Sequence, residues 1–328
     1  MDASGSCGIS STPSSTRTYR APGRVNIIGE HIDYLGGTVL PFACDLEVRI
    51  TGSEADDVVL RSNDGDLEPY IAGVRRALQE AGHSVGGFRG EVTSSIPIGA
   101  GLSSSAALEV AIALALSGGA DIEPDLLRRS EELASGVRGG VMDQTTVLRG
   151  RAGHALLLDC ATGAIEYVPI PPSIGFVVVD TGTRRRLADG RYAQRRAEVE
   201  AGEPKRVRHA SSEQRRVFEA AAVLRAGDLA ALGALVSGSH ASLRDDFEVS
   251  SPALDEAVAV VGAHEACAGA RLVGAGFAGC VLAVVHAGTE EDVARMVRTR
   301  LPGSTAFKVK AVDAAGEVGP GNGRHPVV

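Results

Sequence analysis

The chain lacks tryptophan, and its aromatic residues make up only 4% of 328 residues. With so few large aromatic side chains, its cores must be built mainly from Ala, Val, Leu and Ile. Hydrophobic residues account for 44% of the chain and charged residues for 23%, as in ordinary globular proteins. The length allows two domains, each with a core of its own.

Cysteine pairs and excess positive charge are also missing. The five cysteines are odd in number, and no two of them form a C-x-x-C pair. This argues against a disulfide framework or a zinc site and predicts reduced cytoplasmic thiols. The 33 basic residues are outnumbered by 41 acidic ones, which gives a formal net charge of -8. Because a nucleic-acid binder needs a basic face, we expect no nucleic-acid partner.

Long apolar runs are absent as well. No stretch reaches the roughly 18 uninterrupted apolar residues of a membrane span, so we expect no membrane association. The first residues are rich in Ser, Thr, Gly and Pro and lack the apolar core of a signal peptide. We therefore expect a flexible tail over residues 1–17 and a cytoplasmic protein.

What is present is a mixture of strands and helices in two successive sets. Helical spacing predicts a helix over 67–82, and "IGFVVVDTG" at 174–182 predicts a strand buried on both faces. Further strands are predicted at 24–28, 38–50, 88–96, 154–160, 269–286 (strand, turn, strand) and 306–312, and further helices after the loop at 97–105, at 124–135, 211–245 and 289–300. We expect an α+β fold of two lobes, with domains at 18–170 and 171–316 and a loose tail at 317–328.

The stretch "PIGAGLSSSAALEVAIALAL" at 97–116 begins as a glycine-rich turn and continues as an alanine-rich helix. Gly99 and Gly101 let the backbone turn and approach a ligand closely. The serines at 103–105 offer hydroxyls and an N-cap at a helix N-terminus, where free N–H groups favour a phosphate. A serine there can also ligate Mg²⁺. Taken alone, the stretch is explained equally well by a capped, buried helix.

Three other stretches decide between these interpretations. In chain order the four are "APGRVNIIGEHIDYLGG" at 21–37, "PIGAGLSSSAALE" at 97–109, "GGVMDQ" at 139–144 and "GAGFAGC" at 274–280. This ordered set resembles the GHMP kinase superfamily and, within it, the galactokinase family, over about residues 20 to 315. The resemblance implies the two-lobed GHMP kinase fold, with a ribosomal-protein-S5-like N-terminal lobe and a ferredoxin-like C-terminal lobe. It also implies an ATP- and Mg²⁺-dependent kinase that phosphorylates the anomeric hydroxyl of galactose or a galacto-configured sugar.

The resemblance implies a role for each matched residue. Asp143 would be the catalytic carboxylate beside the anomeric hydroxyl, and Arg24 would stabilise it and the transferred phosphoryl group. Ser105 and Glu131 would hold Mg²⁺, with the neighbouring Glu132 as the alternative to Glu131. The other implied contacts are Gly99, Gly101, Ser103, Ser104 and Ser105 for the phosphates, and Glu30, His31, Asp33, Gly140 and Tyr192 for the sugar.

The sugar side departs from the family pattern. Ile32 and Leu35 stand where Thr and Asn are usual, and Arg138 lies next to the sugar-contacting backbone. The segment between about 50 and 70 is also shorter than is typical. These changes suggest the hypothesis of an extended or anionic galacto-configured substrate, such as an octose phosphate, contacted by Arg138.

The glycine-rich stretch at 274–280 also departs from the family pattern, because Ala275 and Ala278 replace two usual glycines. An alanine with positive φ costs on the order of 1 kcal/mol. Either that turn is reshaped, or these two positions need no left-handed backbone.

Two alternative functions remain besides that of a sugar 1-kinase. One is a catalytically inactive sugar sensor of the same family, which the presence of Ser105-Ala106, Asp143 and Arg24 disfavours. The other is a GHMP kinase for an acid such as homoserine or mevalonate, which would want cations where Glu30 and Asp33 stand. We expect the run at 184–186 to be a solvated basic face with no site role, and the protein to be a monomer or a weak homodimer.

Overall fold

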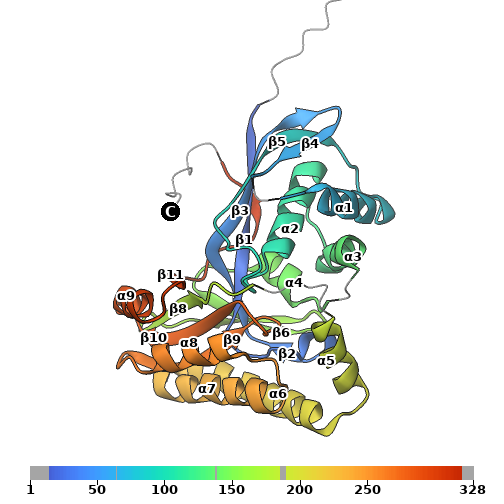
Figure 1. Cartoon of the computed structure of the whole chain (residues 1–328). Helices are drawn as coiled ribbons and strands as arrows, with labels where there is room; N and C mark the ends of the chain where they lie inside the picture. Colours follow the sequence, from blue (N-terminus) through green and yellow to red (C-terminus); the bar gives the residue numbers. More distant parts are fainter. Residues whose placement is uncertain (1–14, 64, 137–138, 185–189, 320–328) are drawn as a thin grey trace, which may run out of the picture.

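The computed structural model describes residues 15–63, 65–136, 139–184 and 190–319, which form two lobes (Figure 1). The N-terminal lobe is built on a five-stranded sheet in the order β12-β1-β3-β5-β4, beside a small sheet in the order β2-β6-β7. Its elements are β1 (Arg17–Asn26), the 3₁₀ helix η1 (Asp33–Leu35), β2 (Thr38–Val39), β3 (Pro41–Ala55), β4 (Val58–Arg61), α1 (Glu68–Glu80), β5 (Gly87–Ser94), α2 (Ser104–Ser117), α3 (Pro124–Ser135), α4 (Met142–Arg149), β6 (His154–Asp159), β7 (Ile165–Pro169) and β12 (Gly316–Glu317).

The C-terminal lobe is built on an antiparallel sheet in the order β11-β8-β10-β9. Helices α7 and α8 pack against β9 and β10, and α9 packs against β8 and β11. The elements are β8 (Ile174–Asp180), α5 (Arg191–Glu200), α6 (Pro204–Ala226), α7 (Leu229–Asp245), α8 (Pro252–Gly262), β9 (Cys267–Val273), β10 (Cys280–His286), α9 (Glu290–Arg300) and β11 (Thr305–Val309).

Strand β8 joins the two lobes through its alternating side chains. Phe176 and Val178 belong to the core shared with the N-terminal lobe, where the Phe42 and Phe176 rings lie 5.0 Å apart. Val177 and Val179 point the other way, into the core beneath the C-terminal helices. All seven residues of β8 are buried, as the apolar run predicted for both faces.

Helix α2 is buried over almost its whole circumference. Of its 14 residues, 10 are buried, and it packs against β1 and β3 on one side and against α1, α3 and α4 on the others. Its many alanines let these neighbours approach closely. A helix fixed on all sides holds its N-terminus, and the glycine-rich loop before it, in a constant position between the lobes.

Some elements differ from the predictions. The helical segments expected over 211–245 begin earlier, at Pro204. They are the two helices α6 and α7, which are divided where Gly227 adopts a left-handed conformation (φ 72°) and Asp228 caps α7. Helices α4, α5 and α8, of only 8, 10 and 11 residues, were not predicted.

The chain end returns to the first lobe. Glu317, which we expected in a loose tail, pairs with Tyr19 in the N-terminal sheet. The rest of that tail from residue 320, and the first 14 residues, lie outside the described residues. The domain boundary near residue 170 stays a prediction.

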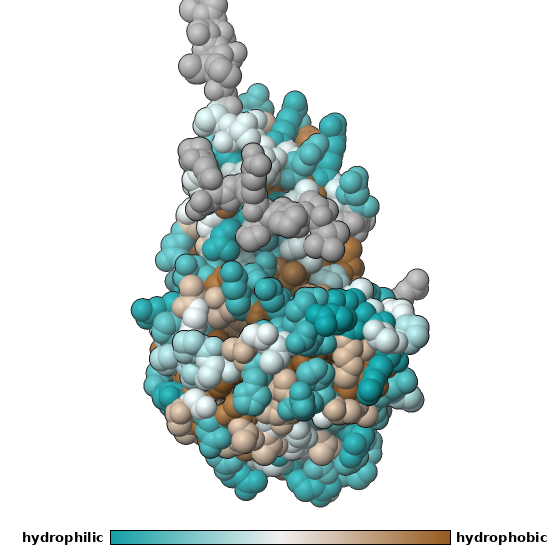
Figure 2. Space-filling view, turned by 90° about the vertical axis from the view of Figure 1, so that its left-hand side faces the viewer, coloured by the Kyte–Doolittle hydropathy of each residue, from teal (hydrophilic) through white to brown (hydrophobic). Residues whose placement is uncertain are grey.

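Within the described part of the chain, no helix is long and apolar enough to span a bilayer. On the face seen in Figure 2, hydrophobic residues are scattered among hydrophilic ones.

Candidate active site

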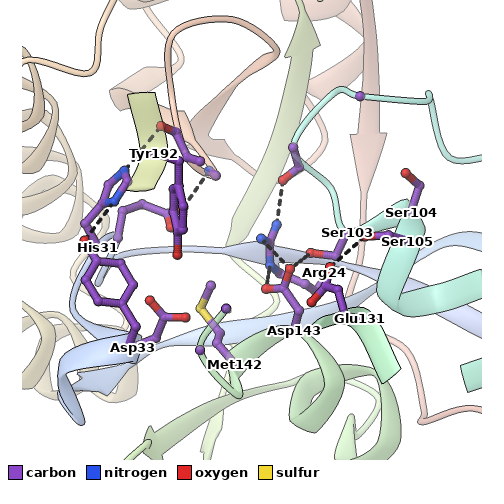
Figure 3. A pocket seen from close by; sticks show the side chains of 18 of the residues that line it. Arg24, His31, Asp33, Ser103, Ser104, Ser105, Glu131, Met142, Asp143 and Tyr192 are labelled. Atoms are coloured by element: carbon purple, nitrogen blue, oxygen red, sulfur yellow. Dashed lines mark hydrogen bonds and ion pairs between the residues drawn. The ribbon is translucent and has the colours of Figure 1, made fainter. Parts of the chain in front are cut away.

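A cavity of about 280 Å³ lies where the two lobes meet. Every residue predicted for the site lines it, except Arg138, which lies outside the described residues. Figure 3 shows Tyr192, His31 and Asp33 on one side of this pocket, and Arg24, Asp143, Glu131 and the three serines on the other.

Arg24 and Asp143 form the centre of the second group. Arg24 lies on β1 and is 5% exposed, and Asp143 lies in the first turn of α4. The guanidinium donates to both carboxylate oxygens, with Nε–Oδ1 at 2.8 Å and Nη2–Oδ2 at 3.1 Å. Its Nη1 also donates to the Gly101 carbonyl at 2.6 Å. This fork fixes the position and plane of the carboxylate.

Ser103 supplies Asp143 with a third hydrogen bond, from Oγ to Oδ2. The residue occupies the N-cap position of α2, but its φ of 60° is left-handed and its side chain makes no capping bond. The side-chain cap expected from the serines at 103–105 is therefore wrong: the residue at the N-cap position makes no capping bond, because its backbone conformation directs the hydroxyl to the carboxylate. A non-glycine residue with such a φ is strained and persists where its surroundings hold it.

The glycine-rich loop before α2 has the geometry of an anion cradle. Gly99 and Gly101 have φ of 70° and 83°, which glycine alone adopts without strain. A Cβ on Gly101 would lie 3.0 Å from the carbonyl oxygen of Val273, so the loop packs tightly against the C-terminal lobe. The free N–H groups of α2 lie at this mouth, as phosphate binding requires.

Arg184 lies beside this loop, although sequence reasoning gave it no role. It forms an ion pair with buried Asp180 at 2.7 Å, and a Cβ on Gly99 would lie 3.4 Å from Arg184 Cδ. The signal in the sequence was the four-residue spacing from the carboxylate at the end of a buried strand.

Ser105 and Glu131 meet across α2 and α3. Ser105 Oγ donates to Glu131 Oε1 at 3.1 Å, and Gln144 Nε2 donates to Glu131 Oε2 at 2.8 Å. Burial, and then the negative charge of Asp143, raise the pKa of Glu131. Glu132 instead pairs with Arg129, so it does not take the place of Glu131.

This oxygen pair fits Mg²⁺. No group of three or more His, Cys, Asp or Glu side chains arranged for a metal was found among the described residues. A hydroxyl and one carboxylate suffice for Mg²⁺, which commonly takes its other ligands from phosphates and water. A cation here would also offset the repulsion between Glu131 and Asp143.

On the other side of the pocket, two residues of one loop are held firmly. Glu30 Oε1 accepts from Arg271 Nη2 at 2.6 Å and from the Gly274 amide at 2.8 Å. The His31 ring stacks on Phe247, with centroids 4.5 Å apart. Both carboxylate and imidazole can bind sugar hydroxyls in fixed directions.

Asp33 and Gly140 touch directly. A Cβ on Gly140 would lie 1.9 Å from Asp33 Oδ2, so only glycine fits beside this carboxyl group. Burial, followed by the charges of Asp143 and Glu30, raises the pKa of Asp33 to about 7.

Three tyrosines line the pocket: Tyr34, Tyr70 and Tyr192. The rings of Tyr34 and Tyr192 lie 5.8 Å apart, and Tyr192 lies 5.7 Å from the ring of His31. Of these only Tyr192 was predicted. Tyr34 stands within the quoted "GEHIDYLGG" and could have been found there, whereas nothing in the sequence marks Tyr70.

The glycine-rich turn after β9 resolves the question raised by its alanines. Positive φ occurs at Gly274, Gly276, Phe277 and Gly279, and at neither Ala275 nor Ala278. The two alanines therefore occupy positions that need no left-handed backbone.

The site combines three features: a loop that can cradle phosphates, a pair of oxygens that can hold a cation, and an arginine-bound carboxylate beside a polar pocket. This combination suits phosphoryl transfer to a hydroxyl. Comparison with known families agrees with this geometry. Residues 10–54 match the galactokinase galactose-binding signature, 69–151 the GHMP kinases N terminal domain, and 219–303 the GHMP kinases C terminal domain.

Curated relatives decide the family. A galactokinase of Roseiflexus sp. (strain RS-1) is 39% identical, over 83% of this chain and 84% of that protein. The chain belongs to the galactokinase family. A second member, the galactokinase of Exiguobacterium sibiricum, is 37% identical over 85% of this chain and 86% of its own length. The enzyme is thus an ATP-dependent sugar kinase that uses Mg²⁺, as predicted.

Solved structures confirm the two-lobed GHMP kinase fold of this galactokinase family member. Lactococcus lactis galactokinase complexed with galactose superposes with a TM-score of 0.83 at 26% identity, covering 93% of this chain and 95% of that one. Methanococcus jannaschii mevalonate kinase superposes with a TM-score of 0.73 at 20% identity over 92% of this chain and 100% of that one, and shares the fold.

Proposed function

We propose that this galactokinase family member transfers the γ-phosphoryl group of ATP to the anomeric C1 hydroxyl of galactose. The observation that carries the proposal is the Arg24–Asp143 fork between the phosphate cradle and the polar pocket. The match of residues 10–54 to a galactose-binding signature supports galactose as the acceptor.

Asp143 would orient the acceptor hydroxyl and take its proton. Its oxygens accept three hydrogen bonds, from Arg24 and Ser103, which fix the direction of the carboxylate. As the bond from O1 to the γ-phosphorus forms, the bond from that phosphorus to the bridging oxygen breaks, and ADP leaves with the electron pair. The hydroxyl proton passes to Asp143.

Arg24 and the phosphate loop would stabilise charge on the transferred group. Arg24 is fixed by Asp143 and the Gly101 carbonyl, so its guanidinium needs no rearrangement during the reaction. Gly99, Gly101 and the serines at 103–105 would bind the β- and γ-phosphates at the N-terminus of α2. Ser105 and Glu131 would hold Mg²⁺, which when bound neutralises charge on the phosphate oxygens.

Glu30, His31, Asp33, Gly140 and Tyr192 would hold the sugar. All five line the pocket, on the loop after β1, before α4 and at the start of α5. Carboxylates next to a glycine backbone and an aromatic ring suit a neutral polyol and do not suit an acid.

Neither the comparisons nor the described residues support the other substrates considered above. The residue expected to meet an anionic extension, Arg138, lies outside the described residues. An inactive sensor would not need Ser105, Glu131, Arg24 and Asp143 assembled around one pocket.

The test is ATP- and Mg²⁺-dependent phosphorylation across a sugar panel, with phosphorus NMR to locate the new ester. The panel holds galactose, glucose, galactosamine, and galacto-configured sugars extended or phosphorylated beyond C6. We expect turnover of free galactose with phosphate on C1. Turnover of extended or anionic sugars alone would overturn the proposal.

Asp143→Asn tests the central role. It keeps the shape but removes the charge, so we expect kcat to fall by about 10²–10⁴-fold while galactose affinity changes little. Asp125→Asn, on an exposed face of α3, is the control and should leave kcat unchanged. Equal kcat values for the two variants would remove Asp143 from the mechanism.

We also infer that the enzyme acts in the cytoplasm as a monomer or a weak homodimer. The free thiols of Cys44, Cys160, Cys267 and Cys280 are in keeping with a reducing compartment. Sedimentation analysis of the purified chain tests the assembly state.

A further inference from the structure

The loop that carries Glu30 and His31 has an unusual backbone. Gly29 has a φ of 113°, and His31, which is not glycine, has a φ of 63°. Such conformations persist only where surrounding groups hold them. The groups that hold this loop therefore also determine where its sugar-facing side chains lie.

The side chains that hydrogen-bond to the loop backbone on both sides of Glu30 come from the C-terminal lobe. The Gly29 amide donates to Glu213 Oε1 at 2.9 Å, and the Glu30 carbonyl accepts from His209 Nε2 at 3.1 Å. Because that carbonyl can only accept, His209 carries its proton on Nε2 and accepts from Ser242 through Nδ1. The loop is thus clamped to α6 on both sides of Glu30, and Ser242 of α7 holds His209 in place.

Arg271 on β9 lies at the centre of this arrangement and is fully buried. Its Nη2 donates to Glu30 Oε1 at 2.6 Å. Its Nη1 donates to Ser239 Oγ at 3.2 Å and lies 3.5 Å from Glu213 Oε1. One guanidinium therefore bridges the carboxylate of the sugar loop and the carboxylate that clamps the loop backbone.

The two carboxylates depend on Arg271 to different degrees. Glu213 has a second cation, Arg216, at 2.7 Å, and a hydrogen bond from Ser239 at 2.6 Å. For Glu30, the ion pair seen within the described part of the chain is the one with Arg271. A buried carboxylate that loses its cation is strongly disfavoured in its charged form.

The hydrogen bonds also fix which oxygen Glu30 can offer. Oε1 is taken by Arg271, which does not line the pocket, and by the amide of Gly274, which does. Glu30 nevertheless lines the pocket, whereas Arg271 does not. Arg271 therefore fixes the plane of the Glu30 carboxylate from outside the pocket. Its other oxygen, Oε2, is left to bind a sugar hydroxyl.

We propose that Arg271 is a positioning residue for sugar recognition, which fixes the Glu30 carboxylate in place and orients its second oxygen toward the sugar. This inference rests on the proposed galactose 1-kinase function. Arg271 itself does not line the pocket. A lysine cannot replace it fully, because a single ammonium group cannot reach Glu30 and Ser239 in the same fixed plane.

The experiment compares Arg271→Lys and Arg271→Met with the wild-type enzyme. Galactose affinity is measured by calorimetry, KM for galactose and for ATP by steady-state kinetics, and stability by thermal unfolding. We expect galactose Kd to rise by about 10-fold for Arg271→Lys and by about 100-fold for Arg271→Met. KM for ATP should change by no more than about 2-fold, because none of the hydrogen bonds and ion pairs of Arg271 goes to the phosphate loop.

Arg206→Lys is the matched control. Arg206 is a 6% exposed arginine on α6, bound to Glu198 at 2.8 Å and Glu248 at 2.7 Å, and neither partner lines the pocket. It should lower thermal stability while leaving galactose Kd unchanged. A merely structural role of Arg271 would make its variants behave like Arg206→Lys, which would overturn the proposal.

A double-mutant cycle covers the case in which Arg271→Met does not fold. Arg271→Lys is combined with Glu30→Gln, and galactose Kd is measured for all four proteins. The proposal predicts that the lysine substitution weakens binding by less than about 2-fold once Glu30 is already neutral. Additive losses would overturn it.

Failure of the proposed function gives a different result. In that case the wild-type enzyme neither binds nor phosphorylates galactose. The inference about Arg271 fails alone when the wild-type enzyme uses galactose and the Arg271 variants keep its affinity.

Discussion

Close approaches between single residues shape both sides of the pocket. Gly140 lies against the Asp33 carboxyl group, and Ser103 accepts a left-handed φ of 60° to reach Asp143. The motifs predicted that these residues share one site. They could not predict the contacts, because the residues come from separate elements that meet only in the folded chain.

Gly140→Ala tests the close contact between Gly140 and the Asp33 carboxyl group. Its Cβ would stand 1.9 Å from Asp33 Oδ2, so the carboxyl group must move away from the sugar. We expect KM for galactose to rise by about 10-fold or more, with a smaller effect on KM for ATP.

The adjacent Gly139→Ala is the control for Gly140→Ala. Its Cβ would lie 3.6 Å from Glu131 Oε2, which is an ordinary contact distance. It should leave KM for galactose within about 2-fold of the wild-type value. Equal effects of the two alanines would contradict the steric argument.

Asp33 should make stability depend on pH. Its pKa is raised from 3.8 to about 7 in the folded protein, so between these values the folded state keeps a proton that the unfolded state has lost. Stability therefore falls as pH rises toward and through 7. Asp33→Asn removes this loss, so we expect its stability advantage over the wild-type enzyme to be larger at pH 8 than at pH 5, by on the order of 1–3 kcal/mol.

Urea unfolding of both proteins without ligands, at pH 5 and pH 8, measures this difference. A stability difference between variant and wild type that does not change with pH would show that Asp33 is ionised normally in the fold.

At the scale of elements, the contact that positions the phosphate loop joins two glycine-rich turns from different lobes. The phosphate loop packs against the turn after β9, where a Cβ on Gly279 would lie 2.8 Å from the Ala100 carbonyl oxygen. Long, strongly patterned elements such as α2 and β8 were predictable from the sequence. Short ones such as α4 were not, since eight residues carry too little periodicity.

Gly279→Ala should disturb the phosphate loop through this contact. Gly279 has a φ of 100°, so alanine brings backbone strain in addition to the clash. We expect a loss of about 1–3 kcal/mol in unfolding free energy and a rise in KM for ATP of about 10-fold.

Ala278→Gly, one residue earlier and without positive φ, should cost no more than about 1 kcal/mol and leave KM for ATP unchanged. If it raised KM for ATP as much as Gly279→Ala does, the loop contact would not be the cause.

At the scale of the whole molecule, the C-terminal segment after β11 packs back onto the N-terminal lobe. After β11 the backbone returns to the N-terminal lobe, where Val312 donates to the Ala43 carbonyl at 2.9 Å and Ala314 donates to that of Gly150 at 2.9 Å. The buried cluster at the lobe junction is equally long-range, since Glu30 and Arg271 are 241 residues apart. No local sequence pattern records such a pair, which is why Arg271 was not predicted.

A chain that ends after Lys310 should therefore be less stable. It loses these hydrogen bonds and the pairing of β12 with β1, and leaves the edge of β1 exposed. We expect its unfolding free energy to fall by about 2–4 kcal/mol in urea. A chain that ends after Gly319 keeps the contacts and should match the full-length protein within about 0.5 kcal/mol; equal losses in both would contradict the role of this segment.

The scarcity of aromatic residues has a practical consequence for the pocket. The chain has no tryptophan and five tyrosines, of which Tyr34, Tyr70 and Tyr192 line the pocket. Ultraviolet emission of the unmodified enzyme comes from tyrosine without a tryptophan background, and most of these emitters stand where ligands bind. The enzyme thus carries an intrinsic optical reporter, and a titration with sugar or nucleotide can be followed in a fluorimeter without any label.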